Sequence, residues 1–164
     1  MTMLPMLLTL AAAQSDRLPP ANPLPPPATE EAAVMAPVQR VLDAIPSRNK
    51  EQVMAQLLPG GSATVAVERP DGTRTIRRMT WDEWGASMKP GPERFVETQG
   101  TPAIEVDGDM AMVWAPYRFT VDGKLSHCGY NHFSLIREPE AGGGGRWKIA
   151  SLAWTQRSTG CDAQ

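Results

Sequence analysis

Apolar and polar residues alternate along the chain from Ala111 to Phe119, with the two-residue period of a β-strand. The pair Asp107-Gly108 stands before this segment, and the pair Asp122-Gly123 follows it. Asp-Gly between alternating segments is a strong signal for a tight β-hairpin. The pattern therefore predicts that residues 103–155 form four consecutive antiparallel strands.

Helical spacing governs the chain before these strands. Two helices are predicted between residues 29 and 58, and the first carries an apolar stripe made of Val34, Val38, Val41, Leu42 and Ile45. Pro37 lies inside this stripe, so the helix either starts there or is kinked. Asn49 followed by Gln52 is a capping pattern that opens the second helix, which we expect Pro59-Gly60-Gly61 to end.

A hairpin and a short helix connect the two halves. Residues 63–68 and 75–78 alternate on either side of a Pro-Asp-Gly turn and are predicted to pair. Thr80 followed by Glu83 is a second capping pattern, which opens a short helix at residues 81–88. A strand at 94–106 follows, interrupted at Gly100-Thr101-Pro102, where a bend would let the sheet curl. This order predicts an α+β fold: a curved antiparallel sheet that forms a cone, with N-terminal helices packed on its concave face.

The Asp122-Gly123 turn also predicts the pairing of the strands on either side of it. Val121 then opposes Lys124, and counting back places Trp114 opposite Asn131. The face richer in bulky apolar groups is predicted to be concave, and it holds Met112, Trp114, His127, Asn131, Phe133, Leu135, Leu152 and Trp154. The half-polar face would meet water or a second subunit, and it holds Tyr130, His132, Ser134, Ser151 and Thr155.

Composition and charge restrict the class of protein. The 164 residues predict one domain plus extra chain, and a net charge of −2 with no Lys/Arg cluster argues against nucleic-acid binding. An apolar run followed by three alanines predicts a signal peptide at residues 1–13, although no Lys or Arg precedes it; a buried or disordered apolar start is the alternative. Proline-rich residues 14–28 predict a solvated tether, which leaves residues 29–161 as the domain.

The two cysteines, Cys128 and Cys161, agree with export. An even number of cysteines in an oxidising compartment predicts one disulfide, with two free thiols as the alternative. Closing a loop of about 33 residues would stabilise the fold by roughly 3 kcal/mol or more. These features predict a periplasmic or secreted protein that has no membrane attachment after the signal peptide is cleaved.

Three segments carry a family resemblance: Tyr117-Arg-Phe119, the run from His127 to Phe133, and the run from Gly145 to Trp154. Together with the element order, they resemble the nuclear transport factor 2-like superfamily, the cystatin-like α+β cone shared with ketosteroid isomerase, scytalone dehydratase and polyketide-cyclase-like proteins. The resemblance covers roughly residues 29–161 and is closest to exported bacterial members with no assigned reaction. It implies a cone open at its wide end; the fold itself hosts enzymes, subunits and binding domains.

Two kinds of chemistry belong to this resemblance. Ketosteroid isomerase-like chemistry needs a carboxylate base in the apolar cone, and residues 110–133 offer none on the predicted concave face, where Asn131 stands in place of an Asp. Dehydratase-like chemistry would use His127 as acid–base beside Asn131, whereas a structural histidine bonded to the backbone is the alternative. His132 lies on the other predicted face, so the two histidines do not converge on a metal site, and no cofactor is predicted.

The predicted function is the binding of a small apolar or aromatic molecule in the cone. Its pocket would be lined by Trp81, Trp84, Met112, Trp114, Asn131, Phe133 and Trp154. An isomerase or dehydratase that uses His127 is the first alternative, and a structural or interaction domain whose cone is filled by its own tryptophans is the second. A homodimer through the convex face is a further predicted partnership.

Overall fold

The computed structural model describes residues 27–141 and 144–161. The predicted signal peptide, residues 1–13, lies outside the described residues, and so does the predicted tether as far as residue 26. Helix α1 (Pro27–Ala44) begins two residues before the predicted domain boundary, and Pro37 lies inside it. None of the helices in the described part of the chain is long and apolar enough to cross a membrane.

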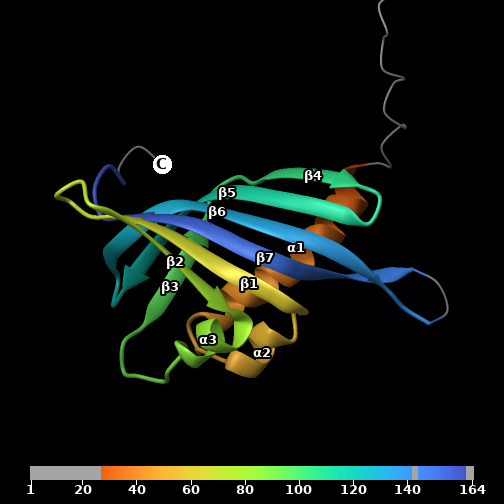
Figure 1. The fold of residues 1–164 in the computed structure, drawn as a ribbon, viewed down its shortest axis with the longest axis horizontal. Helices are drawn as coiled ribbons and strands as arrows, with labels where there is room; N and C mark the ends of the chain where they lie inside the picture. The colour runs from red at the N-terminus through yellow and green to blue at the C-terminus, as the bar shows by residue number, and fades with distance from the viewer. Residues whose placement is uncertain (1–26, 142–143, 162–164) are drawn as a thin grey trace, which may run out of the picture.

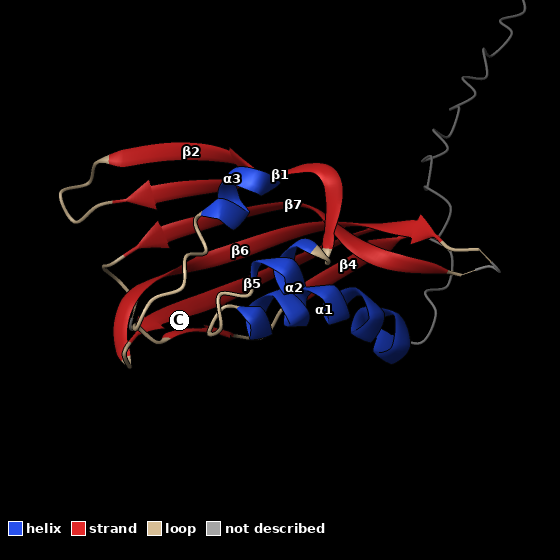
Figure 2. Ribbon diagram, turned by 90° about the horizontal axis from the view of Figure 1, so that it is seen from below, coloured by secondary structure: helices blue, strands red, loops and turns tan. Residues whose placement is uncertain are grey.

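The described part of the chain forms one curved sheet of seven strands, and the helices pack on its concave side (Figures 1 and 2). After α1 the elements are α2 (Lys50–Met54), β1 (Leu57–Glu68), β2 (Arg74–Thr80), α3 (Trp81–Ala86), β3 (Phe95–Gln99), β4 (Ala103–Asp107), β5 (Met110–Val121), β6 (Lys124–Pro139) and β7 (Gly145–Arg157). The strand order is β2-β1-β7-β6-β5-β3, and β4 pairs with the other half of the same edge of β5. The predicted α+β architecture is confirmed.

One pairing departs from the antiparallel prediction. Strand β1 runs parallel to β7, while the other neighbouring strands are antiparallel. The segment Pro59-Gly60-Gly61 does not end α2, as the sequence predicted, but lies within β1, where the pairing with β7 shifts register between Leu57 and Ser62. The parallel pair joins the two ends of the domain, so no local turn signals it.

The apolar stripe of α1 packs on the concave face of the sheet. Val34 and Val38 are completely buried, and Val41 is 2% exposed. They join one core with concave residues of the strands, including Phe133, Leu135 and Ile149. Because burying one such side chain stabilises the fold by about 1.5–3 kcal/mol, this stripe holds the short helical layer in place.

The Asp122-Gly123 turn forms as predicted. Both residues have positive φ, 51° and 78°, as a type I′ hairpin turn requires, and Val121 pairs with Lys124. The turn also anchors β3, because the Asp122 carboxylate accepts a hydrogen bond from the Arg94 backbone N–H at 2.9 Å. The Asp122 N–H donates in return to the Arg94 carbonyl.

A β-bulge just beyond this turn changes the register. Ser126 has no partner on β5, and Phe119 rather than Arg118 pairs with His127. A bulge places two residues of one strand opposite one residue of the other, so every later pair is displaced by one position. The predicted pairing of Trp114 with Asn131 is therefore wrong: Trp114 pairs with His132.

This displacement exchanges the two faces of β5. Met112 and Trp114, predicted on the concave face, lie on the convex one, because a one-residue slip turns each side chain to the opposite side. The concave positions of β5 are Ala111, Val113, Ala115, Tyr117 and Phe119. The faces predicted for Phe133, Leu135, Leu152 and Trp154 are confirmed.

The convex face carries a short aromatic ridge. Trp114, which is 42% exposed, stacks on Tyr130 with ring centroids 5.1 Å apart, and His132 lies 6.0 Å from the same indole. Beside the ridge the face continues over small polar residues of β7, as predicted for Ser151 and Thr155. Contact of this face with a second copy of the chain stays a prediction, which the molar mass in solution would check.

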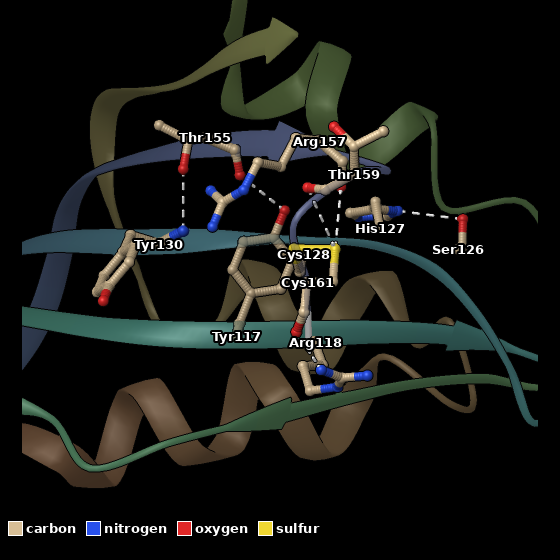
Figure 3. Close-up of a disulfide and its surroundings, with 10 residues drawn as sticks. All are labelled: Tyr117, Arg118, Ser126, His127, Cys128, Tyr130, Thr155, Arg157, Thr159 and Cys161. Atoms are coloured by element: carbon tan, nitrogen blue, oxygen red, sulfur yellow. Dashed lines mark hydrogen bonds between the residues drawn. A yellow bond between two sulfur atoms is a disulfide. The ribbon is translucent and has the colours of Figure 1, made fainter. Parts of the chain in front are cut away.

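The predicted disulfide is present between Cys128 and Cys161, whose Cα atoms are 5.7 Å apart (Figure 3). Both cysteines are buried. The bridge holds the segment after β7 against β6, and the Arg118 guanidinium donates a hydrogen bond to the Cys161 carbonyl. A covalent bond and a charge-assisted hydrogen bond thus close the C-terminal end of the described chain on the sheet.

Gly129 marks a close approach between β6 and β7. A Cβ atom there would lie 1.9 Å from the carbonyl oxygen of Thr155, which is backbone and cannot rotate away. Tyr117, which pairs with Gly129 across β5 and β6, donates its hydroxyl to the same carbonyl at 2.9 Å. The missing side chain therefore lets an aromatic residue of β5 reach across β6 to β7.

We predict that Gly129→Ala lowers the free energy of unfolding by at least about 2 kcal/mol, because the strands must separate to admit the methyl group. Urea denaturation measures the change. The matched control is Gly85→Ala in α3, where the nearest atoms belong to the flexible side chains of Lys50 and Met54. This control should stay within about 1 kcal/mol of the unmodified protein, and equal effects of the two substitutions would contradict the prediction.

Candidate functional site

A cavity of about 220 Å³ lies between the concave face of the sheet and the helices α1 and α3. Its wall is mostly apolar, contributed by Val41, Leu42, Ile45, Trp84, Phe119, Phe133, Leu152 and Trp154. Its polar lining consists of Glu97, Tyr117, His127, Asn131 and Gln156. An apolar hollow with a few converging polar groups is the usual form of a small-molecule site.

The structure brings most of the predicted site residues together. Trp84, Asn131, Phe133 and Trp154 line the cavity, and His127 lines it as well. Trp81 lies in the core instead, where its indole N–H donates to the Leu58 carbonyl at 2.8 Å. Met112 and Trp114 do not reach the cavity, because the bulge in β6 places them on the convex face.

The sequence analysis missed Glu97, which supplies a carboxyl group to the cavity from β3. Pairing of Glu97 with Phe119 puts both side chains on the concave face. Residues 110–133, on which the prediction rested, hold no carboxyl group on the concave face, whereas β3 pairs with the outer edge of β5 and supplies one from there. The available signal was an acidic residue at the same strand parity as Phe95, an aromatic residue suited to a buried face.

Arg48 holds the loop that leads into β3. Its guanidinium donates to the carbonyl oxygens of Lys89 and Glu93 at 2.8 Å and 2.6 Å, and to the Glu93 carboxylate at 3.0 Å. It also lies 3.9 Å from the centre of the Phe95 ring, and its side chain is only 8% exposed. The hydrogen bonds between Asp122 and Arg94 hold the same segment. Together these contacts fix the start of β3 and so the position of Glu97, which is two residues after Phe95.

Glu97 and Asn131 form the polar pair of the cavity. The Asn131 side-chain N–H donates to Oε1 of Glu97 at 2.7 Å, and Asn131 is 5% exposed. Glu97 as a whole is half-buried, because it faces the cavity. Burial disfavours the charged carboxylate and raises the pKa of Glu97 to about 7, while the bond from Asn131 opposes this shift. The carboxyl group therefore exchanges its proton near neutral pH.

His127 is held between aromatic rings. Its imidazole stacks on Phe119 with centroids 4.7 Å apart and meets the Tyr117 ring edge-on at 5.7 Å, while Nδ1 lies 3.2 Å from the Ser126 hydroxyl oxygen (Figure 3). Burial lowers the pKa of His127, so the imidazole is neutral at neutral pH. A neutral imidazole among aromatic rings can offer one donor or one acceptor to a ligand.

Tyr117 is a poor candidate for proton transfer. Its hydroxyl donates to the Thr155 carbonyl (Figure 3), and burial, followed by the Glu97 charge, raises the pKa of the phenol well above its usual value. Arg157 acts in the opposite direction, but more weakly. Among the described residues, no group of three or more His, Cys, Asp or Glu side chains forms a metal site. Of the titratable groups in the described lining, Glu97 is thus the one that changes charge near neutral pH, whereas burial keeps His127 neutral there.

Comparison with known proteins places this fold in a class. No protein-family model matches the chain, and no curated protein matches its sequence. A nuclear transport factor 2 superfamily protein from Salmonella enterica serovar Typhimurium is 16% identical with a TM-score of 0.59, and the match covers 81% of this chain and 94% of that one. A dehydratase candidate of the nuclear transport factor 2-like family from Streptomyces avermitilis is 17% identical with a TM-score of 0.57, covering 79% and 96%.

A ketosteroid isomerase-like protein from Erwinia carotovora atroseptica also matches, with 15% identity and a TM-score of 0.50, covering 78% of this chain and 96% of that one. At these identities the similarity establishes the fold. These neighbours share the nuclear transport factor 2-like, cystatin-like fold that the sequence analysis predicted. The reaction or ligand has to be argued from the cavity itself.

The raised pKa of Glu97 predicts how stability depends on pH. The folded chain holds this proton more tightly than the unfolded chain, whose carboxyl has a pKa near 4.5. Stability from this group is complete below pH 4.5, falls as the pH rises to about 7, and is constant above it; the loss is at most about 3 kcal/mol.

Glu97→Gln should remove this loss, because the amide cannot ionise. We expect the variant to be more stable than the unmodified protein at pH 8, with the difference disappearing near pH 4.5, as measured by urea denaturation. Glu105→Gln, a change of an exposed carboxylate on β4, is the control and should follow the unmodified protein. Parallel pH profiles for the unmodified protein and Glu97→Gln would contradict the argument.

Proposed function

We propose that this protein binds one small, largely apolar molecule in the cavity, with Glu97 and Asn131 as its polar contacts. The observation that carries the proposal is the placement of a carboxyl group in an apolar hollow, bonded to an amide and to no cation in the described part of the chain. Burying a carboxyl group without a counter-charge destabilises a fold, so a functional reason for it is expected.

The size of the cavity restricts the ligand. An apolar cavity of about 150 Å³ can hold benzene, so a volume of about 220 Å³ suits a molecule built on one ring, with one polar substituent. The cone is not filled by its own tryptophans, since Trp81 lies in the core, Trp114 on the convex face, and Trp84 and Trp154 at the cavity wall. These placements support a binding domain over a purely structural one.

Export remains part of the proposal. A disulfide between two buried cysteines is compatible with an oxidising compartment such as the periplasm or the extracellular space. The predicted signal peptide would deliver the chain there. The ligand would then be a molecule that the protein meets outside the cytoplasm.

Ligand binding can be tested with toluene and benzyl alcohol, followed by NMR shifts of the indole N–H groups of Trp84 and Trp154. We expect saturable binding of both probes, and loss of it in Ile45→Trp, where the larger side chain fills the cavity. Asp43→Trp is the matched control, because it adds the same group to the exposed side of α1, two residues before Ile45. Absence of binding to the unmodified protein, or equal loss in both variants, would refute the proposal.

Proton transfer is the second candidate function, and the pKa of Glu97 near 7 favours it. A general base is most effective when its pKa lies close to the working pH. In an isomerisation, the Glu97 carboxylate would take a proton from the carbon next to a carbonyl and return it to a different carbon of the resulting dienolate. Names of two structural neighbours mention a dehydratase and a ketosteroid isomerase-like protein, which agrees with this class of chemistry.

This candidate assigns the base to Glu97 rather than to His127. Conversion of cyclohex-3-enone to cyclohex-2-enone, a one-ring test reaction, should be accelerated, with a rate that rises through about pH 7 as Glu97 ionises. Glu97→Gln should reduce the rate by at least about 100-fold, and His127→Ala by much less. A rate that survives in Glu97→Gln but is lost in His127→Ala would return the role to His127.

A further inference from the structure

The Glu97 carboxyl differs from the carboxylates that form ion pairs elsewhere in the described chain. Those carboxylates face arginines: Glu30 and Asp109 face Arg137, Glu68 faces Arg74, Glu93 faces Arg48, and Glu140 faces Arg146. Glu97 has Asn131 in this place, and the amide engages only Oε1. No described residue donates a hydrogen bond to Oε2, and Glu97 lines the cavity that a ligand would occupy.

The walls around this carboxyl favour positive charge. Neither lysine nor arginine belongs to the described lining of the cavity. Aromatic rings of Trp84, Phe119 and Trp154 border the same space, and the negative face of an aromatic ring attracts a cation. The described lining thus offers one carboxyl group to a cationic ligand, together with several aromatic surfaces and no positively charged side chain.

We propose that the pocket selects a protonated primary amine carried on a single aromatic or apolar ring, with the ammonium group bound to Oε2 of Glu97. This inference rests on the proposed function, that the cavity binds a small molecule, and names the class of that molecule. The ammonium group supplies the positive counter-charge that no described lining residue provides for Glu97, and the ring occupies the apolar part of the cavity.

Other ligand charges fit less well. An anionic ligand would lie beside the Glu97 carboxylate with no basic side chain in the described lining to compensate, so like charges would repel. A neutral ligand of the same shape would gain the apolar contacts but lose the charge-assisted hydrogen bond, which is about twice as strong as a neutral one. An amine should therefore be preferred to an alcohol, and an alcohol to a carboxylate.

Binding of an amine is coupled to the ionisation of Glu97. The other titratable groups in the described lining are Tyr117 on β5 and His127 on β6, since α1, α3 and β7 contribute none. Tyr117 stays neutral. At low pH, a protonated His127 would repel the ammonium group, which weakens amine binding in the same direction as the loss of the Glu97 charge. Affinity for an amine should rise with pH through about 7, and binding at pH 7 should release protons to the buffer.

The test compares benzylamine, benzyl alcohol and benzoate by calorimetric titration of the full chain with its disulfide intact. At pH 8 we expect benzylamine to bind at least about tenfold more tightly than benzyl alcohol, and benzoate to bind more weakly than either. Glu97→Gln should abolish the preference for the amine, so that benzylamine binds this variant no more tightly than benzyl alcohol does. Glu105→Gln, the exposed control, should preserve the preference. Any pH dependence left in Glu97→Gln then belongs to His127.

Three results would overturn the inference. If benzyl alcohol binds and benzylamine binds no more tightly at pH 8, the amine preference is wrong while the proposed binding function stands. A preference that persists in Glu97→Gln would place the ammonium group elsewhere and equally refute it. If none of the three probes, nor toluene, binds to the unmodified protein, the proposed function itself fails.

Discussion

The extra residue in β6, Ser126, determines which side chains of this sheet face the helices. Without it, Trp114 would oppose Asn131 and the bulky side chains of β5 would enter the cone. With it, Tyr117 and Phe119 share the concave face with His127 and Asn131. The bulge lies three residues beyond Gly123 of a tight turn. A local irregularity therefore sets the lining of a cavity between elements that are distant in sequence.

The cavity exists because small or moderate side chains occupy the concave positions of β5 where the indole of Trp114 would otherwise stand. Val113 and Ala115 are completely buried, and Trp114 is turned to the convex side. The absence of a side chain at Gly129 likewise leaves room on the concave face. It allows Tyr117 to lie across β6 and donate a hydrogen bond to β7. The cavity and the hydrogen bond from Tyr117 to β7 thus both depend on the register between β5 and β6.

Glu97 combines two opposing physical effects. Its position is held firmly, because Arg48 clamps the loop before β3 and Asp122 pairs with Arg94 at the start of the strand. Its carboxyl group is nevertheless placed where ionisation is costly, and among the described residues only the Asn131 amide donates a hydrogen bond to it. Stable folds normally pair or expose such groups, so a well-positioned but uncompensated carboxyl is typical of a site that acts on, or is completed by, another molecule.

Local sequence determined much of this protein. Strand alternation, the Asp122-Gly123 turn, the capping residues Asn49 and Thr80, and the apolar stripe of α1 each depend on neighbours a few residues away, and each was predictable. The disulfide followed from the count of two cysteines.

Tertiary structure alone decided the bulge at Ser126, the parallel pairing of β1 with β7, and the arrival of Glu97 beside Asn131. Glu97 and Asn131 are 34 residues apart and meet only because both β3 and β6 pair with β5. Contacts of this kind depend on the packing of whole strands, which no short pattern of residues encodes.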